Sequence, residues 1–262
     1  MKRLVKVVAM AAMMIMGSQA MAQTRSAMFL GATFPIQNYG EFDGSFYDFA
    51  LTSNDVTDDF AGAGIGFNAG LKWYFNVGAP GLGVMLSVDG IYNGPNSELK
   101  TAYRERETSF DGQILDGSFN YNATPKFIHV PAMLGLNYIY HLNPNLGIYI
   151  EAGAGGNMRF ITDMESISKT NVLGIDYHTI SAQSYDMAFS FAYQAGMGFE
   201  VSKRLVIGCS FYDLGAAEVK GEENIINKTI IGDNTTTNKE SHYNTFGTVH
   251  PYIIMARIGF SF

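Results

Sequence analysis

The stretch Tyr252–Phe262, YIIMARIGFSF, alternates without a break between two sets of side chains. One set is apolar throughout and consists of Tyr252, Ile254, Ala256, Ile258, Phe260 and Phe262. The intervening set is mixed and includes Arg257, Gly259 and Ser261. Because successive side chains of a β-strand point to opposite faces, this pattern predicts a strand with one fully apolar face that ends on an aromatic residue.

The same period of two recurs along most of the chain. It predicts seven further strands, at roughly Ser26–Phe34, Gly62–Phe75, Leu82–Asp89, Lys126–Tyr140, Ile148–Gly155, Met187–Glu200 and Leu205–Gly215. Pro131 lies within one of them, where its missing N–H predicts a bulge or a local kink.

The connections between these strands fall into two classes. Those after the second, fourth and sixth strands are a few residues long, whereas the others run to twenty residues or more. We expect the long ones to be external loops near Pro35–Phe60, Asn93–Pro125, Ile161–Asp186 and Ala216–Pro251, with the polar stretch Asn224–Thr237 as a mobile surface loop. Short turns at one end and long loops at the other are typical of outer-membrane barrels.

The N-terminal segment has the features of a secretory signal peptide. Lys2, Arg3 and Lys6 precede an apolar run, and Ala20 and Ala22 form an A-x-A cleavage site. We expect a signal peptide at 1–22 and a single barrel domain at 23–262, beginning at Gln23. Loss of the three basic residues leaves 14 basic and 24 acidic residues, about ten net negative charges, which makes nucleic acid an unfavourable partner.

The two faces of the predicted strands differ in the size of their side chains. The apolar face carries residues such as Phe67, Leu134 and Phe191, and the reverse face is rich in glycine with single ionisable groups. An eight-stranded barrel is only wide enough for side chains to fill it. The bulky residues should therefore face lipid, and the ionised groups inside should pair, because an unpaired buried charge is costly. The predicted lumen charge network consists of Lys72, Asp89, Glu151, Glu200 and Arg257.

The predicted fold is an all-β, eight-stranded, antiparallel, up-and-down transmembrane β-barrel. The chain resembles the small, porin-like outer-membrane β-barrel family of Gram-negative bacteria, which is similar to the barrel part of outer membrane protein A. The residues that carry the likeness are 20–23, 127–134, 153–155, 195–198 and 256–262. The resemblance implies a location in the outer membrane of a Gram-negative bacterium, with membrane lipid and the barrel assembly machinery as partners. The C-terminal residues Tyr252, Ile254, Ile258, Phe260 and Phe262 would be the assembly signal.

The sequence contains few signals of a catalytic or metal-binding site. Asp176, His178 and Ser181 share one predicted loop, and Ser241 and His242 share another, so a loop-sited hydrolase or acyltransferase is a conceivable alternative. Nothing marks a nucleophile or a positioned base, and we expect no catalytic residues, cofactor or metal. Acidic residues that could hold calcium loosely, namely Asp55, Asp58, Asp59, Glu222 and Glu223, are better interpreted as solvated.

The function predicted from the sequence is a structural or surface-interaction role in the cell envelope, without catalysis and as a monomer. The paired charges predict a lumen plugged by side chains. The alternative is a small diffusion pore or a hydrophobic-solute transporter on the same barrel.

Overall fold

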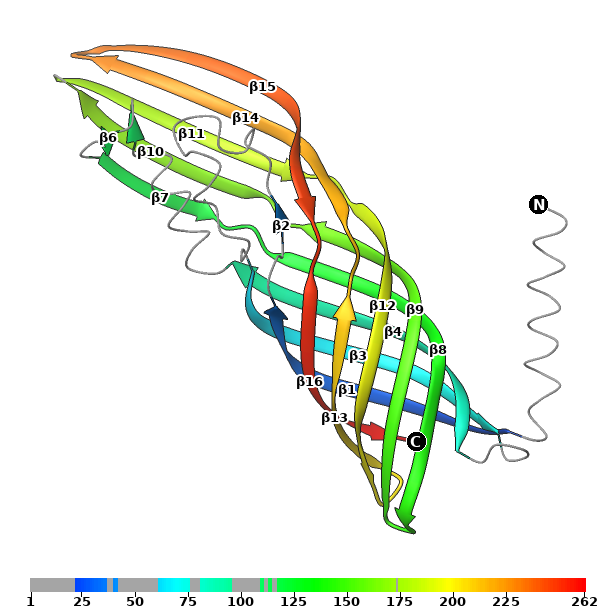
Figure 1. Cartoon of the computed structure of the whole chain (residues 1–262). Helices are drawn as coiled ribbons and strands as arrows, with labels where there is room; N and C mark the ends of the chain where they lie inside the picture. The colour runs from blue at the N-terminus through cyan, green and yellow to red at the C-terminus, as the bar shows by residue number, and fades with distance from the viewer. Residues whose placement is uncertain are drawn as a thin grey trace, which may run out of the picture.

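The computed structural model describes residues 22–36, 40–41, 61–75, 81–95, 109–110, 113–114, 117–172 and 174–262, all within β-strands or short connections. These residues form a barrel and a second sheet that extends from one of its ends (Figure 1). Within the described ranges, no helix has the length and hydropathy needed to cross a membrane.

Eight strands form a closed antiparallel barrel, which confirms the predicted fold. They are β1 (Ala22–Ile36), β3 (Ala61–Phe75), β4 (Leu82–Pro95), β8 (Phe127–Asn143), β9 (Leu146–Ile161), β12 (Ala188–Val201), β13 (Leu205–Asp213) and β16 (Tyr252–Ser261). Each pairs with the next barrel strand along the chain, and the C-terminal strand β16 closes the ring against β1. The topology is therefore up-and-down, and the β8–β9 and β12–β13 turns lie at the end where β16 finishes (Figure 1).

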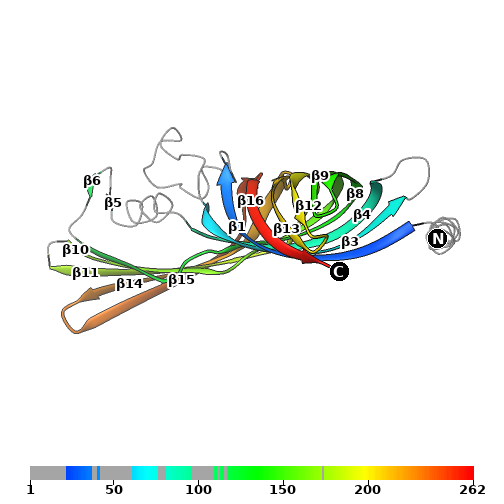
Figure 2. The ribbon, with the colours of Figure 1, turned by 90° about the horizontal axis from the view of Figure 1, so that it is seen from below.

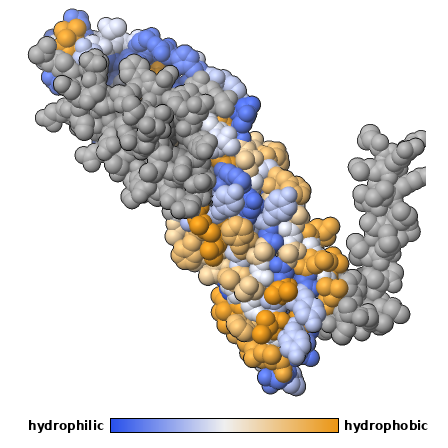
Figure 3. Space-filling model, in the orientation of Figure 1, coloured by the Kyte–Doolittle hydropathy of each residue, from blue (hydrophilic) through white to orange (hydrophobic). Residues whose placement is uncertain are grey.

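The register keeps one face of each strand apolar and outward. Phe67, Leu134 and Phe191 are 46%, 62% and 59% exposed, as the sequence predicted for lipid-facing residues. Met85 and Met255, which alternate with outward residues, are buried inside. In Figure 3 hydrophobic residues cover much of the barrel, whereas hydrophilic residues dominate the far end of the molecule. An apolar outer surface on a closed barrel is the arrangement that satisfies every backbone hydrogen bond in lipid, so this is an outer-membrane barrel.

Pro131 leaves the strand register unchanged, so the expected bulge is wrong. On either side of it Val88 still lies opposite Ala132, and Ile91 opposite His129. The ladder between β4 and β8 is only interrupted there, because proline has no N–H to donate.

The long connections are not loops throughout, which corrects the prediction. Two of them form hairpins, β10 (Met164–Val172) with β11 (Ile175–Tyr185) and β14 (Ala217–Ile231) with β15 (Asn234–Val249). With β7 (Gly117–Ala123) and β2 (Gly40–Glu41) they make a six-stranded sheet in the order β2-β15-β14-β11-β10-β7. We call this sheet the extension. The short strands β5 (Ser109–Phe110) and β6 (Gln113–Ile114) pair separately.

The predicted mobile loop Asn224–Thr237 is thus the outer part of a hairpin. Its strands carry polar and apolar residues on both faces, so hydropathy does not alternate along them, but they are rich in the β-branched residues Ile and Thr. Gly232 and Asp233 separate the two runs, and Gly232 takes a φ of 57°, which a turn at this point requires. A Gly-Asp pair between two such runs is a hairpin signal that hydropathy alone misses.

Candidate functional sites in the lumen and the extension

The centre of the lumen is crossed by an ion pair between Arg257 of β16 and Glu151 of β9. Arg257 Nη2 donates to Glu151 Oε1, and Gln194 Nε2 donates to the same oxygen at 3.1 Å. The guanidinium carbon also lies 4.5 Å from the centre of the Phe29 ring. Arg257 and Glu151 are both buried, so each depends on the other to offset its desolvation.

Asp89 of β4 is held by neutral donors. Asn68 Nδ2 donates to its carboxylate at 2.5 Å, and the Tyr212 hydroxyl donates to the same oxygen at 2.9 Å. Tyr212 comes from β13, on another side of the barrel, so these contacts join distant strands through the lumen.

Glu200 has a partner that the sequence prediction missed. Arg25 Nη1 lies 2.7 Å from Glu200 Oε1, and both side chains are buried. Arg25 was overlooked because the first strand was expected to start at Ser26, whereas β1 begins at Ala22. Lys72 lies on β3, and its side chain falls outside the described residues.

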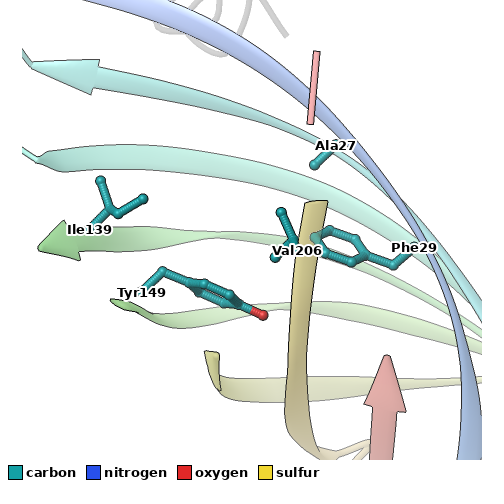
Figure 4. Close-up of a cluster of buried hydrophobic side chains, with 5 residues drawn as sticks. All are labelled: Ala27, Phe29, Ile139, Tyr149 and Val206. Carbon is teal, nitrogen blue, oxygen red and sulfur yellow. The ribbon is translucent and has the colours of Figure 1, made fainter. Parts of the chain in front are cut away.

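Below the central pair the lumen is filled by apolar and aromatic side chains. Ala27, Phe29, Ile139, Tyr149 and Val206 form one buried cluster (Figure 4). Tyr149 fits because Gly198 and Gly208, opposite each other on β12 and β13, leave room for its ring. A Cβ on Gly208 would come within 2.3 Å of the Tyr149 hydroxyl oxygen.

A small pocket remains between Arg257, Glu151 and the wall formed by β3 and β4, with a cavity volume of about 10 Å³. A cavity of this size holds about one water molecule. The pocket therefore has no room for a nutrient-sized solute.

At the end of the lumen next to the extension, Arg159 holds the points where β14 and β15 leave the barrel. Its guanidinium donates to the Val249 carbonyl at 2.6 Å and to the Gly215 carbonyl at 2.9 Å. Asn157 Nδ2 donates to the neighbouring Leu214 carbonyl at 3.2 Å. Buried lumen side chains thus fix the base of the extension, and sequence reasoning did not single out either residue.

One face of the extension is buried and polar. Gln183 Nε2 donates to Glu223 Oε1 at 2.8 Å, and Ser181 Oγ donates to the same oxygen at 3.3 Å. The Tyr185 hydroxyl donates to Gln183 Oε1 at 2.9 Å. This cluster explains the burial of Ser181 and Glu223 through hydrogen bonding.

The residues considered for a catalytic constellation are spread over the extension. His178 lies on β11, opposite Lys169 and Lys228. His242 lies on β15, opposite Glu223 of β14. Asp176 is exposed and bonded to Asn171 Nδ2 at 2.6 Å. Ser241 pairs with Asn224. The geometry does not bring a serine, a histidine and an aspartate of this set together.

The remaining predicted residues are placed as follows. The candidate calcium residues Asp55, Asp58 and Asp59 lie outside the described residues, and Glu222 is exposed on β14. No group of three or more potential metal ligands occurs in the described part of the chain.

Ala22 and Gln23 begin β1, and Ala20 lies outside the described residues. The predicted assembly signal includes Ile254, Ile258 and Phe260, which are exposed on the outward face of β16, and Tyr252, which is partly exposed. Phe262 follows the strand directly and is also exposed.

No family model matches the chain, and no curated protein matches it. Among solved structures, the chain is similar to Ail, the attachment invasion locus protein of Yersinia pestis, with 16% identity over 92% of this chain and 99% of that chain, at a TM-score of 0.37. It is also similar to the outer membrane protein OprG from Pseudomonas aeruginosa, with 12% identity over 92% and 97% of the two chains and a TM-score of 0.41. A major outer membrane protein from Thermus thermophilus has 11% identity over 92% and 99%, at a TM-score of 0.36. Similarity at this level assigns no role. The fold supports the general class of small outer-membrane barrels, without singling out the barrel of outer membrane protein A.

Proposed function

We propose that this protein is a non-conducting, non-catalytic outer-membrane barrel that displays the extension as a binding platform at the cell surface. The observation that carries the proposal is the β14–β15 hairpin, which is paired from Ala217 opposite Val249 to Ile231 opposite Asn234. Residues 234–243 are all exposed, so this part of β15 presents both faces to solvent.

The chemistry of this segment suits a hydrated, polar partner. Residues 234–242, NTTTNKESH, offer hydroxyl, amide and charged groups and no large apolar side chain. An ordered strand presents these groups at a smaller entropic penalty than a disordered loop, because the backbone is already fixed.

The lumen supports the non-conducting part of the proposal. Arg257, Glu151 and Tyr212 are buried in contacts that join different walls of the barrel. A conducting path would require these bonded groups to separate. The alternative of a small diffusion pore would require an open lumen. In this barrel the described side chains occupy that space.

The test removes the outer hairpin and leaves the barrel. Residues 221–244 are replaced by an Asn-Gly turn that joins Lys220 to Thr245, which are cross-strand partners. The full and shortened proteins, both refolded in bilayer discs, are applied to arrays of glycans and of extracellular-matrix proteins. We expect specific binding by the full protein and its loss in the shortened one, with the heat-dependent gel mobility of a closed barrel kept by both.

Planar-bilayer recordings provide the second readout. The proposal expects neither protein to show a conductance of porin size. A reproducible conductance from the full protein, or equal array binding by both proteins, would contradict it.

A further inference from the structure

The two faces of the extension continue the two faces of the barrel wall. Val249, Pro251 and Ile253 are all buried, every second residue, from the end of β15 into β16. Ile253 faces the lumen, so the buried face of the extension continues the lumen face. The opposite, outer face of the extension therefore continues the surface that contacts lipid, and Figure 2 shows the extension as a prolongation of the barrel wall.

A cluster of basic residues lies on this outer face. Lys169 of β10 is directly opposite His178 of β11, which in turn is opposite Lys228 of β14. Lys239 of β15 lies opposite Ile226, one row nearer the barrel. We call these four residues the basic patch. With strands about 4.8 Å apart, the three residues of its main row fall within about 10 Å.

The three lysines of the basic patch form no ion pair with a carboxylate of the described residues, although the whole chain has a net charge of −7. Lys220, on the same sheet, forms an ion pair with Glu218 at 2.8 Å. No ion pair of this kind joins Lys169, Lys228 or Lys239 to a described carboxylate, and the nearby Asp176 is bonded to Asn171. Lys228 and Lys239 are like charges in diagonal positions on the neighbouring strands β14 and β15, where they repel each other, so a multivalent anion would stabilise this arrangement.

The neighbouring row on the same face is apolar. Ile167, Ile180 and Ile226 lie opposite one another on β10, β11 and β14, and each is partly exposed. This row lies between the basic row and the barrel. Such a surface suits a ligand with both anionic groups and apolar patches, as in a phosphorylated oligosaccharide whose sugar rings have C–H faces.

The position of the basic patch indicates where such a ligand comes from. His178 is eight residues before Asp186, at the base of the extension, which corresponds to about 26 Å along the strand. Because strands of outer-membrane barrels tilt by about 35–45°, that length places the patch roughly 20 Å above the base of the extension, on the face that continues the lipid-facing surface. Lipopolysaccharide presents its phosphorylated core sugars above its acyl chains.

We infer that the basic patch binds the phosphorylated core oligosaccharide of lipopolysaccharide in the same membrane and so holds the extension against the leaflet. This interaction uses mainly the outer face of β10, β11 and β14, and it shares only Lys239 with the segment of β15 that is proposed to bind an external partner.

The test counts lipopolysaccharide molecules bound to the full mature chain in detergent micelles by native mass spectrometry. The ligands are a rough lipopolysaccharide with a phosphorylated core, the same molecule without core phosphates, and a soluble heparin oligosaccharide as competitor. The proteins are the wild type, the triple variant K169Q/K228Q/K239Q, and K220Q as the control lysine that already has a partner. Heat-dependent gel mobility verifies that each barrel is closed.

We expect the wild type and K220Q to bind the phosphorylated form with equal affinity, and the triple variant to bind it about 10- to 100-fold more weakly, as for the loss of up to three surface lysine contacts with anionic lipid. Removal of the core phosphates should weaken wild-type binding by a similar factor. Equal binding by the triple variant and the wild type would overturn the inference. So would indifference to the core phosphates, or a preference for heparin over lipopolysaccharide. None of these results depends on the array binding that tests the proposed function.

Discussion

At the scale of single residues, the barrel interior depends on the absence of side chains as much as on their presence. Gly198 and Gly208 are cross-strand partners, and Tyr149 covers both. A Cβ on Gly198 would lie 2.2 Å from the Ile207 carbonyl oxygen and 2.6 Å from the Gly208 Cα, which are backbone atoms that cannot move aside. Gly156 is the opposite case, because it is exposed and a Cβ there meets nothing within 4 Å.

The first prediction compares valine at these two glycines. Gly198→Val should destabilise the barrel by about 1–3 kcal/mol, the usual effect of overpacking. Gly156→Val adds a side chain on the outward face and should change stability by less than about 0.5 kcal/mol. Urea unfolding in lipid vesicles, followed by gel mobility, measures both. Equal effects of the two substitutions would show that Tyr149 and its neighbours do not limit the space.

The second prediction concerns the central ion pair. Arg257→Met leaves Glu151 buried without its cation and should lower the free energy of unfolding by about 3–5 kcal/mol. The double variant Arg257→Met with Glu151→Gln removes the stranded charge, so it should be more stable than Arg257→Met alone. A double-mutant cycle measured by urea unfolding gives the coupling, and additive effects would mean that the two groups do not interact.

At the scale of elements, the contact between β15 and the base of β12 depends on pH. The Tyr243 hydroxyl donates to Asp186 Oδ2 at 2.6 Å. This hydrogen bond to the carboxylate raises the pKa of Tyr243 above its ordinary value of 10.0. Because the folded-state pKa is raised, the stabilisation is fully present below the ordinary pKa and is lost as the pH rises through the raised one.

The third prediction follows from this contact. Asp186→Asn removes the charged acceptor, so the pKa of Tyr243 should fall back toward its ordinary value. A ¹³C-NMR titration of the tyrosine ring carbons measures this shift, with Tyr243→Phe identifying the resonance. An unchanged titration in Asp186→Asn would rule out the contact in solution.

The barrel strands could be predicted from the sequence, and the extension could not, for one physical reason. A strand between lipid and a filled lumen must alternate in hydropathy, and β16 does so along its whole length. The strands β14 and β15 beyond the membrane have no such constraint, since residues 234–243 of β15 are exposed on both faces and residues 225–230 of β14 are partly exposed on both. Only the Gly232-Asp233 turn between runs rich in Ile and Thr indicated a hairpin.

The lumen shows a similar limit on what sequence can predict. Alternation identified Asp89 as an inward residue, but its contact with Tyr212 crosses the barrel and depends on the relative height of non-adjacent strands. Arg159 escaped notice because its acceptors, the carbonyls of Gly215 and Val249, are backbone atoms that carry no sequence signal.

At the scale of the whole molecule, the described strands form two large sheets with different boundaries, besides the short β5–β6 pair. The barrel has no free edge and is stabilised by lipid outside and packed side chains inside. The extension is an open sheet whose described edge strands are β2 and β7, and β2 covers only Thr248 and Val249 of β15. Open edges and solvent-exposed backbone hydrogen bonds characterise regions that unfold locally at low free energy.

The last prediction is that the extension unfolds before the barrel. Hydrogen exchange measured by mass spectrometry across a urea series should show residues 221–244 losing protection at a lower urea concentration than residues 188–201 of β12, because lipid and lumen packing protect only the latter. The variant that lacks residues 221–244 should keep the β12 transition at the same urea midpoint. Arg159→Gln should lower the midpoint of the hairpin more than that of β12, since Arg159 contacts the strands where they leave the barrel. A single transition shared by both regions would instead mean that the two sheets fold as one cooperative unit.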